Sequence, residues 1–253
     1  MVHFVGAGCG APDLVTLRGA RQIADADVII YAGSLVNPAL LAGRKPGCAV
    51  HDSATLTLEQ VLALIREAHA AGHTVVRLHT GDPSIYGAIA EQMRALDALD
   101  IPYDVTPGVS SFSGAAAALC AEYTLPEISQ TVILTRMAGR TPVPEGQDIR
   151  ALAAHRASMA IFLSAHLAAQ LSAELIAGGY TADTPAAVVY KASWPGEERT
   201  LRCTVGTLPQ TLADSGIRST ALILVGDFLG GQGARSKLYD PAFTTGYRKG
   251  TDA

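Results

Sequence analysis

The sequence has few charged and few aromatic residues, and it lacks any long run of apolar residues. Of its 253 residues, 17% are charged and 6% are aromatic, whereas 49% are hydrophobic. A chain this apolar buries enough surface to fold, which excludes a disordered protein, and its length allows one sizeable core or two modest ones. The longest apolar stretches, residues 114–121 and 221–225, fall well short of the ~18 residues that a membrane-spanning helix needs. We therefore expect a soluble globular protein with no membrane partner.

Cysteine is scarce, and basic residues are not in excess. Cys9, Cys48, Cys120 and Cys203 lie tens of residues apart without a C-x-x-C pair, and no histidine spacing resembles a zinc site, so we predict free thiols and no metal site. The formal net charge of −4 argues against a nucleic-acid partner, which would require a basic stripe. The amino terminus leads directly into a strand pattern without the features of a signal peptide, so we expect a cytoplasmic protein.

The first half of the chain alternates short strand-like runs with helical patterns. Residues 58–68 carry the apolar stripe of a helix that packs on a sheet, and Gly72 supplies its end. This β-α-β alternation predicts an α/β domain with a mostly parallel sheet, which we place at residues 1–122. Its strands are expected at residues 2–5, 28–31, 74–78 and 103–105.

The second half predicts another α/β domain, at residues 123–253, because an Ala-rich helix ends in a proline-containing stretch before new strand patterns begin. Only residues 191–198 separate two of these strands, which indicates a hairpin and hence a mixed sheet. The tail after Phe228 is rich in Gly, Ser, Lys and Thr, and we expect it to be loosely held or to pack on a partner. The strands are expected at residues 131–135, 159–163, 186–190, 199–205 and 221–225.

Three loops follow predicted strands of the first domain, at the edge where open parallel sheets bind ligands. Each loop also has a plain structural explanation. The first is compatible with a tight turn, Asp82-Pro83 in the second with the start of a helix, and the serines of the third with a helix cap. Their common position at strand ends is what predicts a ligand site. The loops are residues 6–13, 80–87 and 107–111.

The first loop also fits the loose G-x-G-x-x-A pattern of a dinucleotide fold. That fold places an acidic residue at the end of the second strand, where this sequence has Tyr31 and Ala32. Pro12 falls where the following helix should expose its amide groups to a phosphate. The sequence therefore argues against a nicotinamide dehydrogenase.

Taken together, the three loops resemble the tetrapyrrole methyltransferase family, which also includes uroporphyrinogen-III methyltransferase and diphthine synthase. The resemblance covers nearly the whole chain. It rests on the G-x-G loop, the segment Gly81-Asp82-Pro83-x-x-Tyr86-Gly87 and the turn Pro107-Gly108-Val109-Ser110-Ser111. Residues 31–36, 135–142 and 189–195 are similar to the branch that methylates precorrin-4 at C11. The family's fold implies two α/β domains with S-adenosylmethionine bound in the cleft between them, and usually a homodimer.

The resemblance also implies contacts to S-adenosylmethionine, carried over position by position. Cys9 stands where the family has a proline, and Ala11 where it has an acidic residue, so we do not expect the first loop to have a charged role. The remaining contacts lie in the second and third loops and at strand ends of the second domain. The implied set is Cys9, Thr80, Gly81, Asp82, Ile85, Ser110, Ser111, Leu163, Thr220 and Ala221.

The implied reaction transfers a methyl group to C11 of precorrin-4, giving precorrin-5 and S-adenosylhomocysteine on the route to cobalamin. The sequence shows no Ser-His-Asp or Cys-His set, and an electron-rich macrocycle can attack the sulfonium methyl group without one, so we assign no catalytic residue. Arg136, Arg140 and Lys191 are candidates to bind the substrate carboxylates, unless they are solvated loop charges. Trp194 either lies against the macrocycle or pins the hairpin.

Three alternatives stay open at this point. The cobalt-containing form of the substrate would require nearly the same residues. Methylation at another position, as in uroporphyrinogen-III methyltransferase, is disfavoured by the segments at residues 140–142 and 194–195. A non-catalytic protein that holds tetrapyrroles or senses the cofactor would bind these ligands without turnover.

Overall fold

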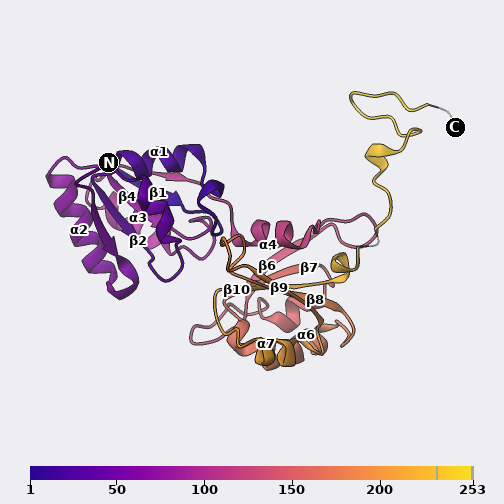
Figure 1. Cartoon of the computed structure of the whole chain (residues 1–253). Coiled ribbons are helices and arrows are strands. Elements are labelled where there is room, and N and C mark those ends of the chain that lie inside the picture. Colours follow the sequence, from indigo (N-terminus) through magenta and orange to yellow (C-terminus); the bar gives the residue numbers. More distant parts are fainter. Residues whose placement is uncertain (232, 252–253) are drawn as a thin grey trace. The chain divides into compact units, whose positions relative to one another are not determined.

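The computed structural model describes residues 1–231 and 233–251, and the chain divides into two units (Figure 1). Unit 1 comprises Met1–Ala115 together with Lys191–Glu198, and unit 2 comprises Ala116–Tyr190 together with the residues from Arg199 onward. The division that we predicted, between residues 122 and 123, was continuous in sequence. The observed division differs in two ways: unit 1 ends at Ala115, within α4 (Ser111–Leu119), and it also takes in the loop that joins two strands of the second half.

Unit 1 contains a five-stranded, all-parallel sheet with the strand order β3-β2-β4-β1-β5. The predicted parallel sheet and its four predicted strands are confirmed. The additional edge strand β3 was missed because it is short and mostly exposed, so it has no apolar pattern. The strands are β1 (Val2–Gly6), β2 (Val28–Tyr31), β3 (Ala49–Asp52), β4 (Val75–His79) and β5 (Tyr103–Thr106).

Helices cover both faces of this sheet. On one face, helix α2 (Leu58–Ala70) and helix α3 (Ile89–Asp97) bury Ile65 and Leu96 against the strands, and on the other, helix α1 (Leu17–Asp25) buries Ile23. The predicted helix at residues 58–68 is therefore confirmed. It begins with a capping box, in which Thr57 and Gln60 satisfy each other's backbone N–H groups. Short 3₁₀ turns η1 (Pro12–Leu14), η2 (Pro38–Gly43) and η3 (Ser53–Thr55) connect these elements.

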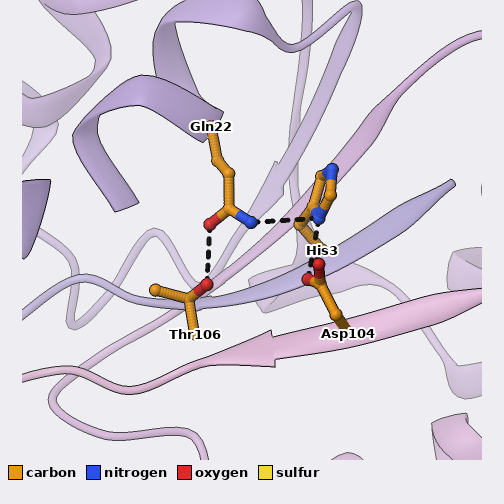
Figure 2. A network of polar contacts seen from close by, with 4 residues as sticks. All are labelled: His3, Gln22, Asp104 and Thr106. Carbon is orange, nitrogen blue, oxygen red and sulfur yellow. Dashed lines mark hydrogen bonds and ion pairs between the residues drawn. The ribbon is translucent and has the colours of Figure 1, made fainter. Parts of the chain in front are cut away.

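A polar network ties strand β5, at the sheet edge, to β1 and α1 (Figure 2). Thr106 Oγ1 donates to Gln22 Oε1 at 2.8 Å, and Gln22 Nε2 lies 3.0 Å from His3 Nδ1. The same His3 nitrogen lies 2.7 Å from a carboxylate oxygen of Asp104. Because Thr106 is the last residue of β5, the network fixes the point from which the third loop departs.

Unit 2 contains a second five-stranded sheet, with the strand order β6-β7-β10-β8-β9. Strands β6 and β7 are parallel, and the other neighbours are antiparallel, so the predicted mixed sheet is confirmed. The predicted hairpin is also confirmed, since β8 pairs with β9. The strands are β6 (Val132–Arg136), β7 (Ser158–Phe162), β8 (Pro185–Tyr190), β9 (Arg199–Thr204) and β10 (Ala221–Val225).

The core of unit 2 lies between this sheet and three helices on one of its faces (Figure 1). Met159 and Ile161 of β7 pack with Leu171 and Leu175 of α6 and with Leu208 of α7, all without solvent exposure. The helices are α5 (Ile149–Ala153), α6 (Ala168–Gly178) and α7 (Leu208–Ser215), while α4 (Ser111–Leu119) runs from unit 1 into unit 2.

Beyond β10 the chain forms two short 3₁₀ turns, η5 (Asp227–Gly230) and η6 (Lys237–Tyr239). Leu229 is the last buried residue of the described chain, and Leu238, Tyr239 and Tyr247 are largely exposed. Within residues 1–231 and 233–251, no helix combines the length and the apolar character needed to cross a membrane.

Candidate functional site

The first and second loops are joined backbone to backbone. Gly8 N–H donates to the Gly81 carbonyl at 3.2 Å, and Gly81 N–H donates to the Gly8 carbonyl at 2.8 Å. Ala7 N–H donates to the His79 carbonyl at 2.7 Å. The Gly8–Gly81 pair is an isolated antiparallel bridge that lies beyond the ends of the parallel strands β1 and β4. The two loops therefore form one continuous surface at the carboxyl edge of the sheet.

The third loop joins the same surface through glycine contacts. A Cβ atom on Gly108 would lie 2.1 Å from the Gly81 carbonyl oxygen and 2.8 Å from Gly6 Cα, so only glycine fits there. Strand β1 lies between β4 and β5, and all three are parallel, so their carboxyl ends share one edge. The expected meeting of the three loops at one edge is confirmed.

Asp82 connects the second loop with the third. One of its carboxylate oxygens accepts hydrogen bonds from the Ser84 N–H at 2.9 Å and from the Ser84 hydroxyl, and the other accepts from Gly108 N–H at 3.0 Å. Partial burial would raise the pKa of Asp82, but the bonds from Ser84 and Gly108 outweigh it and lower the pKa below its ordinary value. The alternative that Asp82-Pro83 begins a helix is wrong, because α3 begins only at Ile89.

The other predicted contacts of unit 1 lie around this surface. Cys9 and Ser110 are buried, and Ser111 is the first residue of α4. The N–H groups of a helix's first turn and its dipole favour an anionic group such as a carboxylate. Thr80 Oγ1 donates to the Leu35 carbonyl at 3.2 Å, and Ile85 is half-buried. The structure thus brings together all seven predicted cofactor residues of unit 1.

Unit 2 gathers the remaining predicted cofactor residues at one edge of its own sheet. Leu163 follows β7, and Thr220 and Ala221 stand at the start of β10, which is antiparallel to β7. Leu163 and Thr220 both have a φ angle of 54°, which is unfavourable for these side chains, and Leu163 is 61% exposed. Such backbone strain is concentrated at functional sites.

The three predicted substrate residues have different surroundings. Arg136 donates from Nη1 to the Met137 and Thr141 carbonyls at 3.0 and 3.2 Å, and from Nη2 to the Pro142 carbonyl at 2.8 Å, so it shapes the loop after β6. Arg140, in that same loop, is exposed and makes no hydrogen bond or ion pair with the described residues. Lys191 belongs to unit 1, where it forms an ion pair with Glu197.

Sequence reasoning missed a buried polar chain under the second loop. Arg77 donates from Nε to Gln92 Oε1 at 3.2 Å and from Nη1 to the Ile30 carbonyl at 3.1 Å, and Gln92 Nε2 donates to the Ala88 carbonyl. Burial lowers the pKa of Arg77 to about 10. Charged and polar residues inside the apolar strand β4 were the available signal.

His79, the last residue of β4, is also buried, and burial together with the charge of Arg77 lowers its pKa to about 3. Its ring is therefore neutral at physiological pH. Among the described residues, its Nε2 is the only buried side-chain nitrogen or oxygen without a hydrogen-bond partner. His79 directly precedes Thr80 in the chain, and its ring lies beside that of Phe4, with 6.1 Å between the ring centroids.

These features suit a ligand with both polar and apolar parts. In unit 1, serine and threonine hydroxyls and the start of α4 offer hydrogen bonds, while Ile85 offers an apolar contact. S-adenosylmethionine has a carboxylate, a ribose and an adenine that match these donors and surfaces, so the residues fit it. In the part of the chain that the structure describes, no group of three or more His, Cys, Asp or Glu residues could hold a metal ion.

Comparison with known proteins identifies relatives over nearly the full length. A family model described as "Tetrapyrrole (Corrin/Porphyrin) Methylases" matches residues 1–209. The chain is 49% identical to the cobalt-precorrin-4 C(11)-methyltransferase of Methanocaldococcus jannaschii, covering 98% of this chain and 96% of that protein. It is also 49% identical to the precorrin-4 C(11)-methyltransferase of Pseudomonas aeruginosa, covering 98% and 99%.

Solved structures with the same fold include a cobalt precorrin-4 methyltransferase described as a cobalamin biosynthetic enzyme. It is 45% identical, with a TM-score of 0.88 over 90% of this chain and 95% of that chain. A uroporphyrin-III C-methyltransferase from Thermus thermophilus, complexed with S-adenyl homocysteine, is 27% identical, with a TM-score of 0.75 over 90% and 92%. The predicted fold, two α/β units with one parallel and one mixed sheet, is confirmed by this similarity.

Proposed function

Because the chain belongs to the tetrapyrrole (corrin/porphyrin) methylase family, we propose that it is an S-adenosylmethionine-dependent enzyme that methylates C11 of precorrin-4, or of its cobalt form, in cobalamin biosynthesis. The observation that carries this proposal is the 49% identity, over almost the whole length, to two enzymes named for methylation at C11. Three segments resemble this branch in the sequence, and each begins at the end of a strand and continues into the loop that follows, at β2, β6 and β8 respectively: residues 31–36, 135–142 and 189–195.

The proposed cofactor is S-adenosylmethionine, and its contacts are the ten residues that the resemblance implies. A related methyltransferase structure with S-adenyl homocysteine bound supports this assignment. In unit 1, Ser110 and Ser111 would hold the polar groups, next to the backbone of Gly8 and Gly81, whose N–H groups donate to each other's carbonyls. Asp82 would act by fixing these loops, because its carboxylate is already bonded to Ser84 and Gly108. In unit 2, Leu163, Thr220 and Ala221 would supply the remaining contacts.

When bound, S-adenosylmethionine supplies an electrophilic methyl group. The chain's task is then to align that group with the macrocycle carbon and to exclude water, and alignment can contribute ~7–11 kcal/mol to lowering a barrier. The rigid, glycine-packed meeting of the three loops suits this role. The macrocycle carbon is the nucleophile, and methylation is completed by loss of a proton from the macrocycle. We assign no residue as its acceptor.

The proposed substrate is an acidic tetrapyrrole, with Arg140 as the first candidate to bind a carboxylate. Arg140 is exposed and has no described partner, whereas Arg136 donates to three carbonyls and Lys191 is paired with Glu197. The metal-free and cobalt-containing substrates stay equal alternatives, because relatives named for each are equally identical to this chain. Methylation of uroporphyrinogen-III is less favoured, because that relative is only 27% identical.

We further propose a homodimer that works in the cytoplasm. The homodimer is implied by the family resemblance, and the exposed side chains of Leu238, Tyr239 and Tyr247 provide apolar surface for association. All four cysteines are free, as is usual in a reducing compartment. Light scattering of the purified protein tests the assembly, since one chain has a mass of 26.2 kDa. A mass of one chain at micromolar concentration would exclude the dimer.

The function is tested by incubating the protein with methyl-labelled S-adenosylmethionine and either precorrin-4 or cobalt-precorrin-4. We expect label in the macrocycle, at C11 by NMR, and the preferred substrate distinguishes the two routes. Uroporphyrinogen-III serves as the control substrate. Cofactor binding without transfer to any of the three would refute the enzymatic function and favour the non-catalytic alternative.

A further inference from the structure

The segment Lys191–Glu198 packs against the first loop, within unit 1. Ser193 Oγ accepts a hydrogen bond from Ala11 N–H at 3.0 Å and donates to Cys9 Sγ at 3.1 Å. One hydroxyl group therefore bridges the two residues on either side of Gly10. The two partners lie more than 180 positions earlier in the chain, so this is a tertiary contact that joins the hairpin loop to the first loop.

The Trp194 side chain packs directly against Gly10 of the same loop. A Cβ atom on Gly10 would lie 2.2 Å from Trp194 Cδ1 and 2.8 Å from the Ala192 carbonyl oxygen. The Trp194 ring is covered in turn by Lys191, whose Nζ lies 4.6 Å from the ring centroid. The close packing leaves no room for any residue larger than glycine at position 10.

Two further contacts hold residues 9–11 from other directions. Asn37 Nδ2 donates to the Gly10 carbonyl at 2.9 Å. A Cβ atom on Gly114 of α4 would lie 2.8 Å from Cys9 Sγ, so the helix backbone abuts the thiol. Residues 9–11 therefore have fixed partners on several sides, although they lie in a loop.

Two residues of the segment Lys191–Glu198 have strained backbone φ angles. Lys191 and Ser193 have φ angles of 48° and 63°, in the left-handed region that favours glycine. A hairpin loop could avoid this strain with glycine or asparagine at these positions. Ser193 therefore combines a strained backbone with a hydroxyl group that is bonded to the first loop, and strained residues of this kind are concentrated at ligand sites.

We infer that Ser193 and Trp194 are positioning residues, which hold Cys9, Gly10 and Ala11 in the conformation that binds the cofactor. The inference rests on the proposed function, because it takes the first loop to be part of a site for S-adenosylmethionine. It adds two residues that none of the three loops contains, and it gives the β8–β9 hairpin a role toward the cofactor. Neither residue needs to touch the cofactor for this role.

Trp194 makes the inference directly measurable, because it is the only tryptophan of the chain. Binding of S-adenosylhomocysteine at the first loop should change the fluorescence of a tryptophan packed on Gly10. The same titration, repeated by calorimetry, gives the dissociation constant. Two variants remove the Ser193 hydroxyl: Ser193→Ala, and Ser193→Gly, which also relieves the left-handed φ angle. Ser172→Ala is the matched control, since it removes a buried hydroxyl that donates to the Val205 carbonyl in unit 2.

We expect both Ser193 variants to bind S-adenosylhomocysteine about tenfold more weakly, because Ala11 N–H loses its acceptor. The Ser172 control should lose stability but bind within about twofold of the wild type, which separates positioning from general destabilisation. Ser193 variants with wild-type affinity, or a wild-type Trp194 emission that stays unchanged at saturation, would overturn the inference alone. A wild-type protein that binds no S-adenosylhomocysteine would overturn the proposed function and the inference with it.

Discussion

At the scale of single residues, Asp82 shows how one side chain joins two loops. One carboxylate oxygen accepts from Ser84 and the other from Gly108 N–H, whereas asparagine has a single accepting oxygen and would turn an NH2 group toward one of these donors. We expect Asp82→Asn to destabilise the protein by about 1–2 kcal/mol and to weaken S-adenosylhomocysteine binding. Urea unfolding at neutral pH and calorimetry measure the two effects. Unchanged stability together with unchanged affinity would show that the bond to Gly108 is dispensable.

The effect of Asp82 should also depend on pH, with a sign set by its lowered pKa. A carboxyl group whose pKa is lower in the folded state than in the unfolded state stabilises the protein above its unfolded pKa, and this stabilisation is lost as the pH falls through the folded value. The stability difference between Asp82→Asn and the wild type should therefore stay constant down to about pH 5 and shrink below about pH 4. A difference that grows on acidification would contradict this assignment.

Substitution of Arg140 tests whether this side chain binds the substrate. If its guanidinium binds a substrate carboxylate, Arg140→Ala should raise KM for the tetrapyrrole about five- to thirtyfold and leave the cofactor affinity unchanged. Arg218→Ala is the control, because Arg218 is also an exposed loop arginine of unit 2. If the two variants have the same KM for the tetrapyrrole, Arg140 does not bind the substrate and is only a solvated charge in the loop.

At the scale of elements, the loops pack through glycines that differ in how much room they have. A Cβ atom on Gly108 would overlap the Gly81 carbonyl, whereas one on Gly81 would meet Ser110 Cα and Ser111 N at 3.6 Å, which is ordinary contact. Gly108→Ala should therefore cost about 3 kcal/mol or more, and Gly81→Ala only the ~1–2 kcal/mol of its left-handed φ angle. Urea unfolding ranks them, and the reverse order would refute the close packing of the loops.

Leu163 combines strain with exposure at the end of β7. Leu163→Gly should stabilise the protein by up to about 1 kcal/mol, because glycine adopts a φ of 54° without penalty. It should also weaken S-adenosylhomocysteine binding about fivefold through the lost apolar contact. Arg156→Gly is the matched control, with an exposed side chain and a φ of 49° outside the proposed site. Stabilisation without any loss of affinity would remove Leu163 from the cofactor contacts.

The elements also show what the sequence could predict. Strands such as β10 and the helix at residues 58–68 were predictable, because their apolar patterns have the period of the structure that they form. The meeting of three loops followed from strand ends in a parallel sheet. The short edge strand β3 had no such pattern. From the sequence, Asp82-Pro83 was equally compatible with the start of a helix. In the structure, Asp82 instead accepts hydrogen bonds from Ser84 and from Gly108, and Gly108 belongs to another loop, so a local pattern could not predict this arrangement.

Other parts of the site depended on contacts distant in sequence. Ser193 and Cys9 are 184 positions apart in the sequence, so no local sequence pattern could predict the hydrogen bond between them. Arg77 was visible as a charge in an apolar strand, but its partners, Gln92 and the Ile30 carbonyl, come from two other elements. The resemblance implied a set of candidate cofactor contacts, whereas Arg77 and Ser193, whose partners are distant in the sequence, were not among them.

At the scale of the whole molecule, both hydrophobic cores are complete before the carboxyl-terminal tail begins. The unit 2 core extends to Val225, Leu229 is the last buried residue described, and the described residues from Gly230 onward are half-buried or exposed. A chain that ends at Gly231 should therefore unfold within about 0.5 kcal/mol of the full chain and bind S-adenosylhomocysteine equally well. Urea unfolding and calorimetry test these two expectations.

The same truncation tests whether the tail contributes to the proposed homodimer. It removes Leu238, Tyr239 and Tyr247, whose exposed fractions of 63%, 72% and 105% are the highest among the large hydrophobic residues described in unit 2. Exposed apolar groups of this size are commonly covered by a partner. If the tail contributes to the proposed homodimer, the truncated chain should dissociate to monomers at concentrations where the full chain stays dimeric. Light scattering across a dilution series measures the dissociation of the dimer. If the truncated and full chains dimerise with the same affinity, the interface lies outside the tail. That result would not affect the description of the two cores.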